Sequence, residues 1–69
     1  MRLKKLRKAT NISQQKLAFV LGASQNTISQ YERKIREADY EMLIKIADYF
    51  EVSIDYLLER TDNPTFLKD

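Results

Sequence analysis

The sequence predicts an all-α fold, a compact domain of five short helices, and three observations lead to it. Apolar residues recur at spacings of three and four, and no segment alternates with the period of two that marks a half-buried strand. A Ser or Asp precedes most of these apolar segments, at the position of a helix N-cap. With 69 residues, 43% of them apolar, the chain is one domain near the lower size limit for folding alone.

The first expected helix covers about residues 2–10 and places Leu3 and Leu6 in the core. Its exposed residues are basic: Arg2, Lys4, Lys5 and Lys8. Asn11 follows this helix, and Asn tolerates the left-handed conformation in which many helices end.

The second and third expected helices form a helix-turn-helix. Ser13 is a good N-cap for a helix over Gln14–Leu21, and Gly22, the only Gly in the chain, follows where a positive φ would be cheapest. Ser24 then caps a helix that runs to about Arg33. Two helices joined by a turn of about three residues, with a Gly at the end of the first, describe this motif. The buried positions of the first of them are Leu17, Ala18 and Leu21.

Two further helices complete a domain that covers residues 1–60. Asp39 caps the fourth helix, whose expected buried stripe is Tyr40, Leu43, Ile46, Ala47 and Phe50. Ser53 caps a last short helix that ends at about Arg60. Its candidates for burial are Ile54, Leu57 and Leu58. Residues 61–69 are expected to form a short C-terminal tail.

Charge is divided between the two halves of the chain. Residues 1–36 hold nine Lys or Arg and one acid, for a net charge of +8. Residues 37–69 hold three Lys or Arg and nine acids, for a net charge of −6, which leaves the +2 of the whole chain. Such a domain has a basic end that attracts polyanions and an acidic end that repels them. The division favours an oriented encounter with nucleic acid over one with an anionic membrane.

The composition excludes several classes of function. Without Cys the chain has no disulfide or thiolate metal site, and a reducing cytosol is its natural compartment. Without His it lacks the usual general base and zinc ligand, and its acids show no spacing for a metal or an acid–base pair. Its apolar runs fall far below the roughly 20 residues that span a bilayer. We therefore expect no enzyme, no metal, no cofactor and no membrane partner.

The outward face of the third helix has an unusual polar composition. When Ile28 turns inward, the residues on the opposite side are Gln25, Asn26, Ser29, Gln30 and Arg33. A helix kept only for solubility would usually carry Lys and Glu. Gln and Asn can instead read adenine in a bidentate pair, Arg suits guanine, and Ser can serve several base edges. Taken alone, the polar face of this helix fits two interpretations equally well: neutral residues without a specific role, or residues that read bases.

Cations around this helix favour base readout. Lys16 lies in the first turn of the second helix, where the helix dipole prefers an acid, so a phosphate is expected there. Further cations follow the third helix: Arg33, Lys34 and Arg36. Polar groups framed by cations are expected where phosphates position a protein and bases specify its site. The expected base contacts are Gln25, Asn26, Ser29 and Gln30, the first two reaching deepest into a major groove.

The stretch SQQKLAFVLGASQNTISQYER, followed by LIKIADYFEVSIDYLL, resembles the lambda-repressor-like family of helix-turn-helix DNA-binding domains, of the Cro/cI or XRE type. The resemblance covers about residues 2–60 and implies the family's five-helix fold. It rests on the small Ala18 within the second helix, on the turn residue Gly22, and on several apolar positions. These positions are Leu17, Leu21, Ala23, Ile28 and Tyr31.

The resemblance implies roles for matching residues. Gln14 matches a phosphate contact at the start of the second helix, and Arg7 and Glu32 match a buried salt bridge between the first and third helices. Losing one partner of such a pair costs roughly 3–5 kcal/mol. Together with the cations above, the expected phosphate contacts are Gln14, Lys16, Ser24, Arg33, Lys34 and Arg36.

The chain departs from the family's pattern at several positions. Lys34 stands where many members have a Gly that ends the third helix, so that exit is expected to be less tight or strained. Asn11 replaces a frequent Gly, and Ala38 stands where Pro is common. Phe19 and Val20 occupy positions that are usually polar and exposed. We expect them to pack on the last helix, and the alternative is an apolar patch for a partner.

The function expected from these features is a sequence-specific transcriptional regulator of repressor type, which binds double-stranded DNA at an operator as a homodimer. Two-fold symmetry would place two half-sites about 34 Å apart. Candidates for the interface are Tyr49, Tyr56, Phe66 and Leu67. Such a regulator would be cytoplasmic, and associated with the nucleoid when bound to DNA.

Two alternatives stay open. An antitoxin of a toxin pair, or a controller protein of a restriction system, would have the same fold and would bind a basic protein partner through the acidic half, residues 37–69. A protein-interaction module without specific DNA binding would dock an acidic protein on the basic half. Salt-titrated DNA binding separates that module from a regulator.

Overall fold

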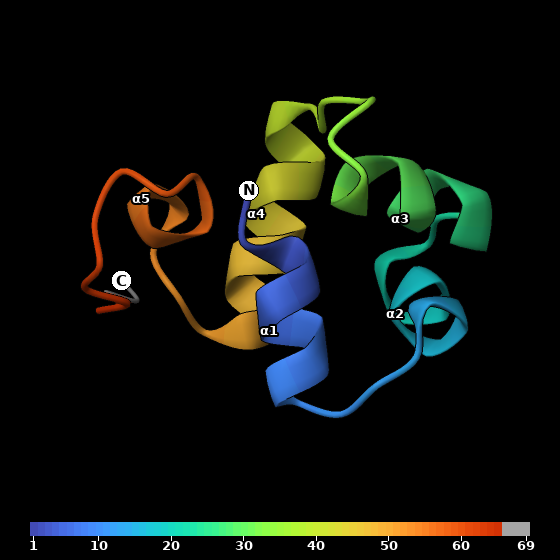
Figure 1. The fold of residues 1–69 in the computed structure, drawn as a ribbon, viewed down its shortest axis with the longest axis horizontal. Helices are drawn as coiled ribbons and strands as arrows, with labels where there is room; N and C mark the ends of the chain where they lie inside the picture. The colour runs from blue at the N-terminus through green and yellow to red at the C-terminus, as the bar shows by residue number, and fades with distance from the viewer. Residues whose placement is uncertain (66–69) are drawn as a thin grey trace.

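The computed structural model describes residues 1–65, which fold into five α-helices without a strand (Figure 1). The helices are α1 (Leu3–Ala9), α2 (Gln14–Leu21), α3 (Gln25–Glu32), α4 (Tyr40–Phe50) and α5 (Ile54–Leu57). The expected all-α fold is confirmed, as are the bounds of the second helix. The last helix is shorter than predicted, because Glu59 adopts a φ of 65° and ends the helical path before Arg60.

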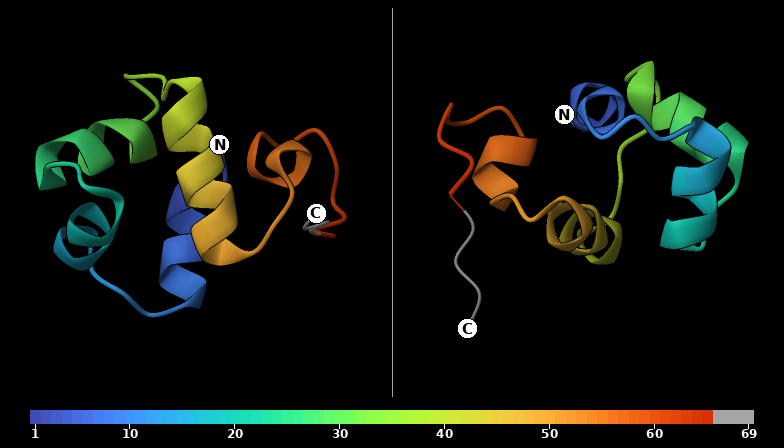
Figure 2. Two further views of the ribbon diagram at one scale, coloured as in Figure 1. Left: turned by 180° about the vertical axis from the view of Figure 1, so that it is seen from behind. Right: turned by 90° about the horizontal axis from the view of Figure 1, so that it is seen from below.

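The helices are arranged in three groups along the longest dimension of a molecule of 29 × 22 × 21 Å. α1 and α4 lie in the middle, α2 and α3 lie together at one end, and α5 lies at the other end (Figure 1 and Figure 2). The helix-turn-helix therefore occupies one end of the molecule, and the short last helix is remote from it.

Four of the five helices begin at a capping side chain, as the sequence predicts. In each of them the side-chain oxygen of the cap accepts a hydrogen bond from the backbone N–H three residues later. The caps are Ser13, Ser24, Asp39 and Ser53. Each is worth about 1 kcal/mol relative to Ala, which is a large contribution in a domain of this size.

Several helices end at a residue in the left-handed conformation. Gly22 ends α2 with a φ of 69°, and Asn11 follows α1 with a φ of 60°. After α3 the left-handed residue is Lys34, with a φ of 61°. A side chain at such a position costs about 1 kcal/mol that a Gly would not. The expected strain at the exit of α3 is therefore found at Lys34.

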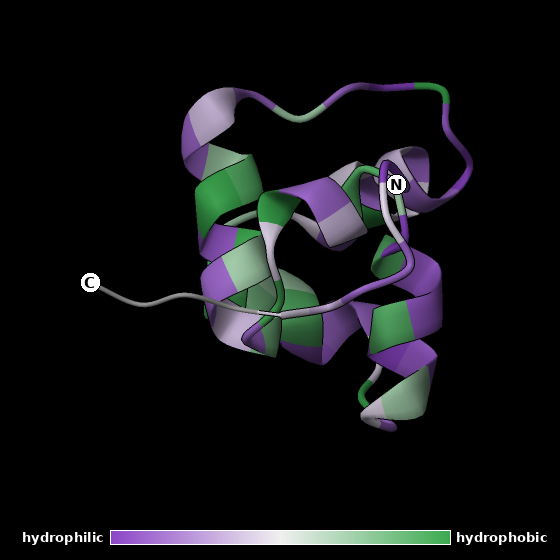
Figure 3. Ribbon diagram, turned by 90° about the vertical axis from the view of Figure 1, so that its left-hand side faces the viewer, coloured by the Kyte–Doolittle hydropathy of each residue, from purple (hydrophilic) through white to green (hydrophobic). Residues whose placement is uncertain are grey.

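The core receives one fully buried side chain from each helix. These side chains are Leu3, Leu17, Ile28, Ile46 and Leu57. Figure 3 shows that the helices carry hydrophilic as well as hydrophobic segments, as expected of helices that pack only one side on a core. Each helix thus contributes its own anchor to one shared core.

Three residues that the apolar pattern places in the core lie on the surface. Tyr40, the first residue of α4, is 85% exposed. Ile54 and Leu58 are also exposed. α5 is a single turn, so one side chain, Leu57, reaches the interior and its neighbours do not.

The prediction that Phe19 and Val20 pack on the last helix is wrong. Both lie on α2, at the opposite end of the molecule from α5 (Figure 1). Their exposed fractions are 73% and 41%. Both side chains are therefore exposed on the surface of α2.

Arg2 is a structural residue and not the exposed cation that the sequence predicts. Its backbone N–H donates to the carbonyl of Leu57, and its Nε donates to the carbonyl of Tyr56, both at 2.8 Å. Its Nη2 donates to the carbonyl of Thr61 at 2.8 Å, and the guanidinium carbon lies 4.4 Å from the centroid of the Tyr56 ring. Arg2 therefore fastens the start of the chain to α5 and to the first residue of the expected tail.

Candidate nucleic-acid interface

A tight turn and a shared core hold α3 against α2. In the turn, the N–H of Ala23 donates to the carbonyl of Ala18 at 2.9 Å, and Gly22 supplies the left-handed residue. Leu17 of α2 and Ile28 of α3 are buried in the same cluster. Because these apolar positions fix the inner side of α3, its outer side faces solvent as one surface.

The four residues expected to contact bases lie on the outer side of α3. Gln25 and Asn26, in the first turn, are exposed, and Ser29 and Gln30, one turn later, are half-buried. Amide and hydroxyl groups of this kind can both donate and accept hydrogen bonds. The structure brings these four side chains to one surface, which we call the reading face.

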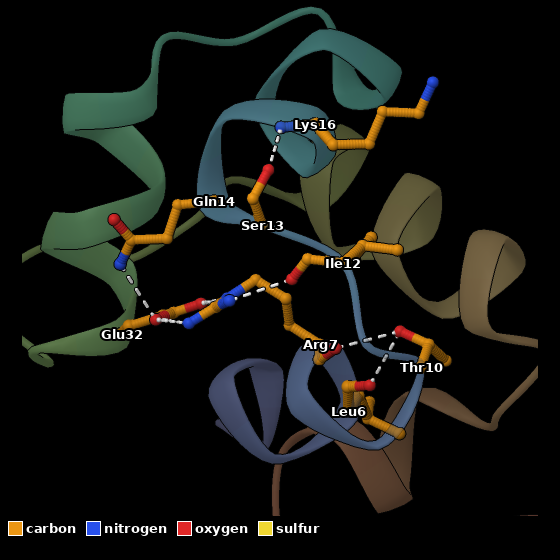
Figure 4. Close-up of polar contacts among 8 residues, drawn as sticks. All are labelled: Leu6, Arg7, Thr10, Ile12, Ser13, Gln14, Lys16 and Glu32. Atoms are coloured by element: carbon orange, nitrogen blue, oxygen red, sulfur yellow. Dashed lines mark hydrogen bonds and ion pairs between the residues drawn. The ribbon is translucent and has the colours of Figure 1, made fainter.

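On one flank of the reading face, Glu32 of α3 is paired with Arg7 of α1 (Figure 4). Arg7 Nε donates to Glu32 Oε2 at 2.6 Å, and Arg7 Nη2 donates to Glu32 Oε1 at 3.1 Å. A third donor, Arg7 Nη1, lies 2.9 Å from the carbonyl oxygen of Ile12. The side chains of Arg7 and Glu32 are 13% and 3% exposed. This two-point charged contact fastens the end of α3 to α1.

The surroundings of Glu32 keep its carboxylate charged. Burial alone would raise the pKa of Glu32, but hydrogen bonds from Arg7 and Gln14 and the charge of Arg7 outweigh burial, so this pKa lies below its ordinary value. The hydrogen bond to Glu32 in turn raises the pKa of Arg7, against the effect of its burial. Both groups are therefore charged near neutral pH.

Gln14, expected at a phosphate, belongs to the same flank. Its Nε2 donates to Glu32 Oε1 at 3.0 Å (Figure 4). An amide NH2 group has two hydrogens, so one remains for a phosphate at the start of α2. Gln14 thus connects the Arg7–Glu32 pair to the first turn of α2, where an anion would be favoured.

The cations expected at phosphates are all exposed, but their contacts within the chain differ. They are Lys16, Arg33, Lys34 and Arg36. Lys16 Nζ lies 5.7 Å from the centroid of the Phe19 ring. Lys34 Nζ lies 3.7 Å from Glu59 Oε2, so an acid of the C-terminal half partly neutralises this cation.

On the other flank of the reading face, Arg36 lies against α3 by contacts that the sequence did not suggest. Its Nη1 donates to Gln30 Oε1 at 3.3 Å and to Thr27 Oγ1 at 3.4 Å. Thr27 also shares a 2.9 Å hydrogen bond with the hydroxyl of Ser24, which accepts the N–H of Thr27 as the cap of α3. Either hydroxyl can be the donor of that bond, and where Thr27 donates, the hydroxyl hydrogen of Ser24 stays available for a phosphate. The spacing of three places residues 24, 27 and 30 along one side of α3, but it gives no signal for Arg36.

The described residues hold no second kind of site that could bind a metal or cross a membrane. No group of three or more His, Cys, Asp or Glu in residues 1–65 is placed to hold a metal ion. None of the helices in this part of the chain combines the length and the hydropathy of a transmembrane span. The polar and charged groups that converge on one surface are those around α3.

Comparison with known proteins assigns a family. A family model described as helix-turn-helix matches residues 3–57. Three relatives come from Bacillus subtilis (strain 168). The uncharacterized HTH-type transcriptional regulator YqaE is 40% identical to this chain over 67 residues. The HTH-type transcriptional regulators ImmR and AnsR are 36% identical over 61 residues and 41% identical over 59 residues. The matches cover 97%, 88% and 86% of this chain but 58%, 48% and 51% of the relatives, so the chain spans about half their length. No solved structure matches at a comparable level.

Proposed function

The chain belongs to the XRE-type helix-turn-helix family, and on that premise we propose that it is a sequence-specific transcriptional regulator that binds double-stranded DNA. The observation that carries the proposal is the reading face on α3, four side chains that both donate and accept hydrogen bonds, together with exposed cations on α2 and directly after α3. Such a surface suits the major groove, where base edges present donors and acceptors between two rows of phosphates. The printed names of the relatives describe HTH-type transcriptional regulators and support this proposal.

The contacts divide into two kinds in this proposal. Gln25 and Asn26 at the start of α3 reach deepest into the groove, and Ser29 and Gln30 follow one turn later. The groups at phosphates are Gln14, Lys16, Ser24, Arg33, Lys34 and Arg36. Exposure of the four cations supports the division, because a cation must reach a phosphate without first leaving a buried site.

We also propose that the protein acts as a homodimer, because one reading helix contacts too few base pairs for specific binding. The exposed Ile44 and Ile54 line a groove of about 300 Å³ between α4 and α5. This groove lies toward the end of the molecule opposite α3 (Figure 1), so two copies joined through it would keep both reading faces free. Among the interface residues expected from the sequence, Tyr49 is exposed, Tyr56 is covered by Arg2, and Phe66 and Leu67 lie outside the described residues.

A repressor is the simplest role for such a dimer, because occupation of an operator is enough to block transcription and requires no ligand. Its place of action would be the cytoplasm, on the nucleoid. Light scattering with and without an operator duplex tests the dimer: Ile54→Asp is expected to lower the dimer fraction, and Phe19→Ser, at an exposed apolar site on α2, is the matched control. Equal masses for the two variants would contradict an interface at α5.

Selection of bound sites from random duplexes tests the function, since it yields base preference and half-site spacing together. We expect a two-fold symmetric operator with half-sites about 34 Å apart. Gln25→Ala or Asn26→Ala is expected to lose about 1–3 kcal/mol on that operator and to relax the preference for one base pair. Lys16→Ala should weaken binding equally on all sequences and reduce the salt slope by about one. Equal affinity of the unchanged protein for all duplexes would overturn the proposal.

A second candidate is an antitoxin or controller protein, whose acidic half binds a basic partner. The observation in its favour is that every Asp and Glu between residues 37 and 65 is exposed. Purification with the protein encoded next to this one tests it. A stable complex with a small basic protein that dissociates at high salt would support this role, and a chain that purifies alone would argue against it.

A further inference from the structure

We propose that Arg36 is a positioning residue that sets the base preference of Gln30, an inference that rests on the proposed function. Arg36 Nη1 lies 3.3 Å from Gln30 Oε1, so the guanidinium donates to the oxygen of that amide. The sequence assigns Arg36 to a phosphate only. The structure places it against a side chain of the reading face.

The path of the chain after α3 brings the guanidinium to this place. Lys34, with its φ of 61°, turns the chain back, and the N–H of Ile35 donates to the carbonyl of Gln30 at 3.1 Å. Arg36 then lies along the flank of α3 that carries Thr27 and Gln30, with its guanidinium carbon 5.9 Å from the centroid of the buried Tyr31 ring. The contact therefore has two supports besides the Gln30 oxygen, the Thr27 hydroxyl and the Tyr31 ring.

This contact determines which half of the Gln30 amide is available to DNA. A Gln side chain reads adenine by accepting from N6 and donating to N7, which requires both Oε1 and Nε2. The guanidinium is always charged and has only donors, so Arg36 binds the oxygen and never the nitrogen. Because the two atoms branch apart from one carbon, the NH2 group is then the half directed away from Arg36. Gln30 held in this way presents donors.

A Gln30 that directs its NH2 group toward the groove favours base edges that accept. In the major groove guanine presents two acceptors, O6 and N7, whereas adenine pairs an acceptor with a donor. The Arg36–Gln30 pair is therefore expected to prefer guanine at one position of each half-site. Without Arg36, the Gln30 amide is expected to be free to rotate and to bind adenine in a bidentate pair.

The test is base preference at that position, measured on the preferred operator and its single-base variants. Arg36→Ala is expected to shift the ratio of guanine to adenine affinity toward adenine by about fivefold or more, within the range of one side-chain pairing. The double variant Arg36→Ala with Gln30→Ala should have the same preference as Gln30→Ala alone. Lys34→Gly is the matched control, because it removes a neighbouring cation and fits the left-handed backbone; it should weaken all sequences equally.

A second measurement needs no DNA. The side-chain NH2 signal of Gln30 in a nitrogen–proton NMR spectrum is expected to move in Arg36→Ala and to stay in place in Lys34→Gly. An unmoved Gln30 signal, or an Arg36→Ala variant that weakens all operators by the same factor, overturns the positioning role and leaves the regulator in place. Uniform binding of all duplexes by the unchanged protein overturns the regulator, and this inference with it.

Discussion

The two flanks of α3 are each held by one arginine, and the two arginines hold it in different ways. Arg7 reaches Glu32 with two nitrogens, at 2.6 and 3.1 Å, and both side chains are nearly buried. Arg36 reaches Gln30 and Thr27 with one nitrogen, at 3.3 and 3.4 Å, from an exposed loop. The first contact joins opposite charges in short bonds, and the second joins a charge to neutral groups in long ones.

The difference separates two tasks that a reading helix must perform. Its axis must be fixed relative to the rest of the domain, which a buried charged contact to α1 can do because it is costly to break. Its side chains must also present chosen donors and acceptors, which an exposed guanidinium can influence without fixing the helix. We expect the Arg7 flank to control the stability of the domain and the Arg36 flank to control its base preference.

Breaking the Arg7–Glu32 pair is expected to have the largest effect. Glu32→Ala leaves Arg7 charged and nearly buried without its partner, which costs about 3–5 kcal/mol. The free energy of unfolding of a domain of this size is about 3–10 kcal/mol in total, so much of the variant should be unfolded at 25 °C. Urea unfolding followed by circular dichroism measures the loss. Arg33→Ala, which removes an exposed neighbouring charge, is the control and should change stability by less than about 0.5 kcal/mol.

Acid should weaken the same flank. The folded state lowers the pKa of Glu32, so the unfolded state binds its proton more readily. The stability that Glu32 contributes is therefore complete above the unfolded pKa of about 4.5 and is lost as pH falls through the lower folded pKa. Urea titrations between pH 7 and pH 3 check this, with Glu32→Gln as the reference. A wild-type profile parallel to that of Glu32→Gln would show that the pair has no such role.

Local signals explain why most of the fold could be predicted. Ser13, Ser24, Asp39 and Ser53 each cap a helix through atoms three residues apart, and Gly22 marks a turn by its own backbone freedom. The exposure of Tyr40 and Phe19 could not be predicted in this way. This exposure depends on where each helix lies and ends relative to the others, and the periodicity within one helix carries no information about that placement.

The candidate site shows the same limit. Residue types and spacing predicted the reading face, because one helix carries all of it. The partners of those residues come from elsewhere in the chain: Gln14 meets Glu32, and Lys34 meets Glu59, across 18 and 25 positions. Only the resemblance to a family indicated Arg7 with Glu32. Nothing in the sequence placed Arg36 on Gln30, since that contact depends on the left-handed turn at Lys34.

Loss of the Gln14 side chain is expected to have an intermediate effect. Gln14→Ala removes one hydrogen bond to a charged and nearly buried carboxylate, which costs about 1.5 kcal/mol. The Arg7–Glu32 contact remains, so the domain should stay folded. Urea unfolding measures the loss, and Gln15→Ala, on the exposed side of the same turn, should differ from wild type by less than about 0.5 kcal/mol. Equal losses in the two variants would place Gln14 outside the network.

Arg36→Ala should change stability least, although it removes the same chemical group as Arg7→Ala. Its bonds to Gln30 and Thr27 are long and exposed, and water replaces them once they are broken, so the expected loss is below about 0.5 kcal/mol. Urea unfolding of the two arginine variants side by side measures the contrast. If Arg36→Ala lost as much stability as Arg7→Ala, the loop would help to fix the position of α3, which would contradict a role for Arg36 confined to Gln30. A small loss of stability together with an altered base preference would show that Arg7 fixes the position of α3 and that Arg36 orients the Gln30 amide.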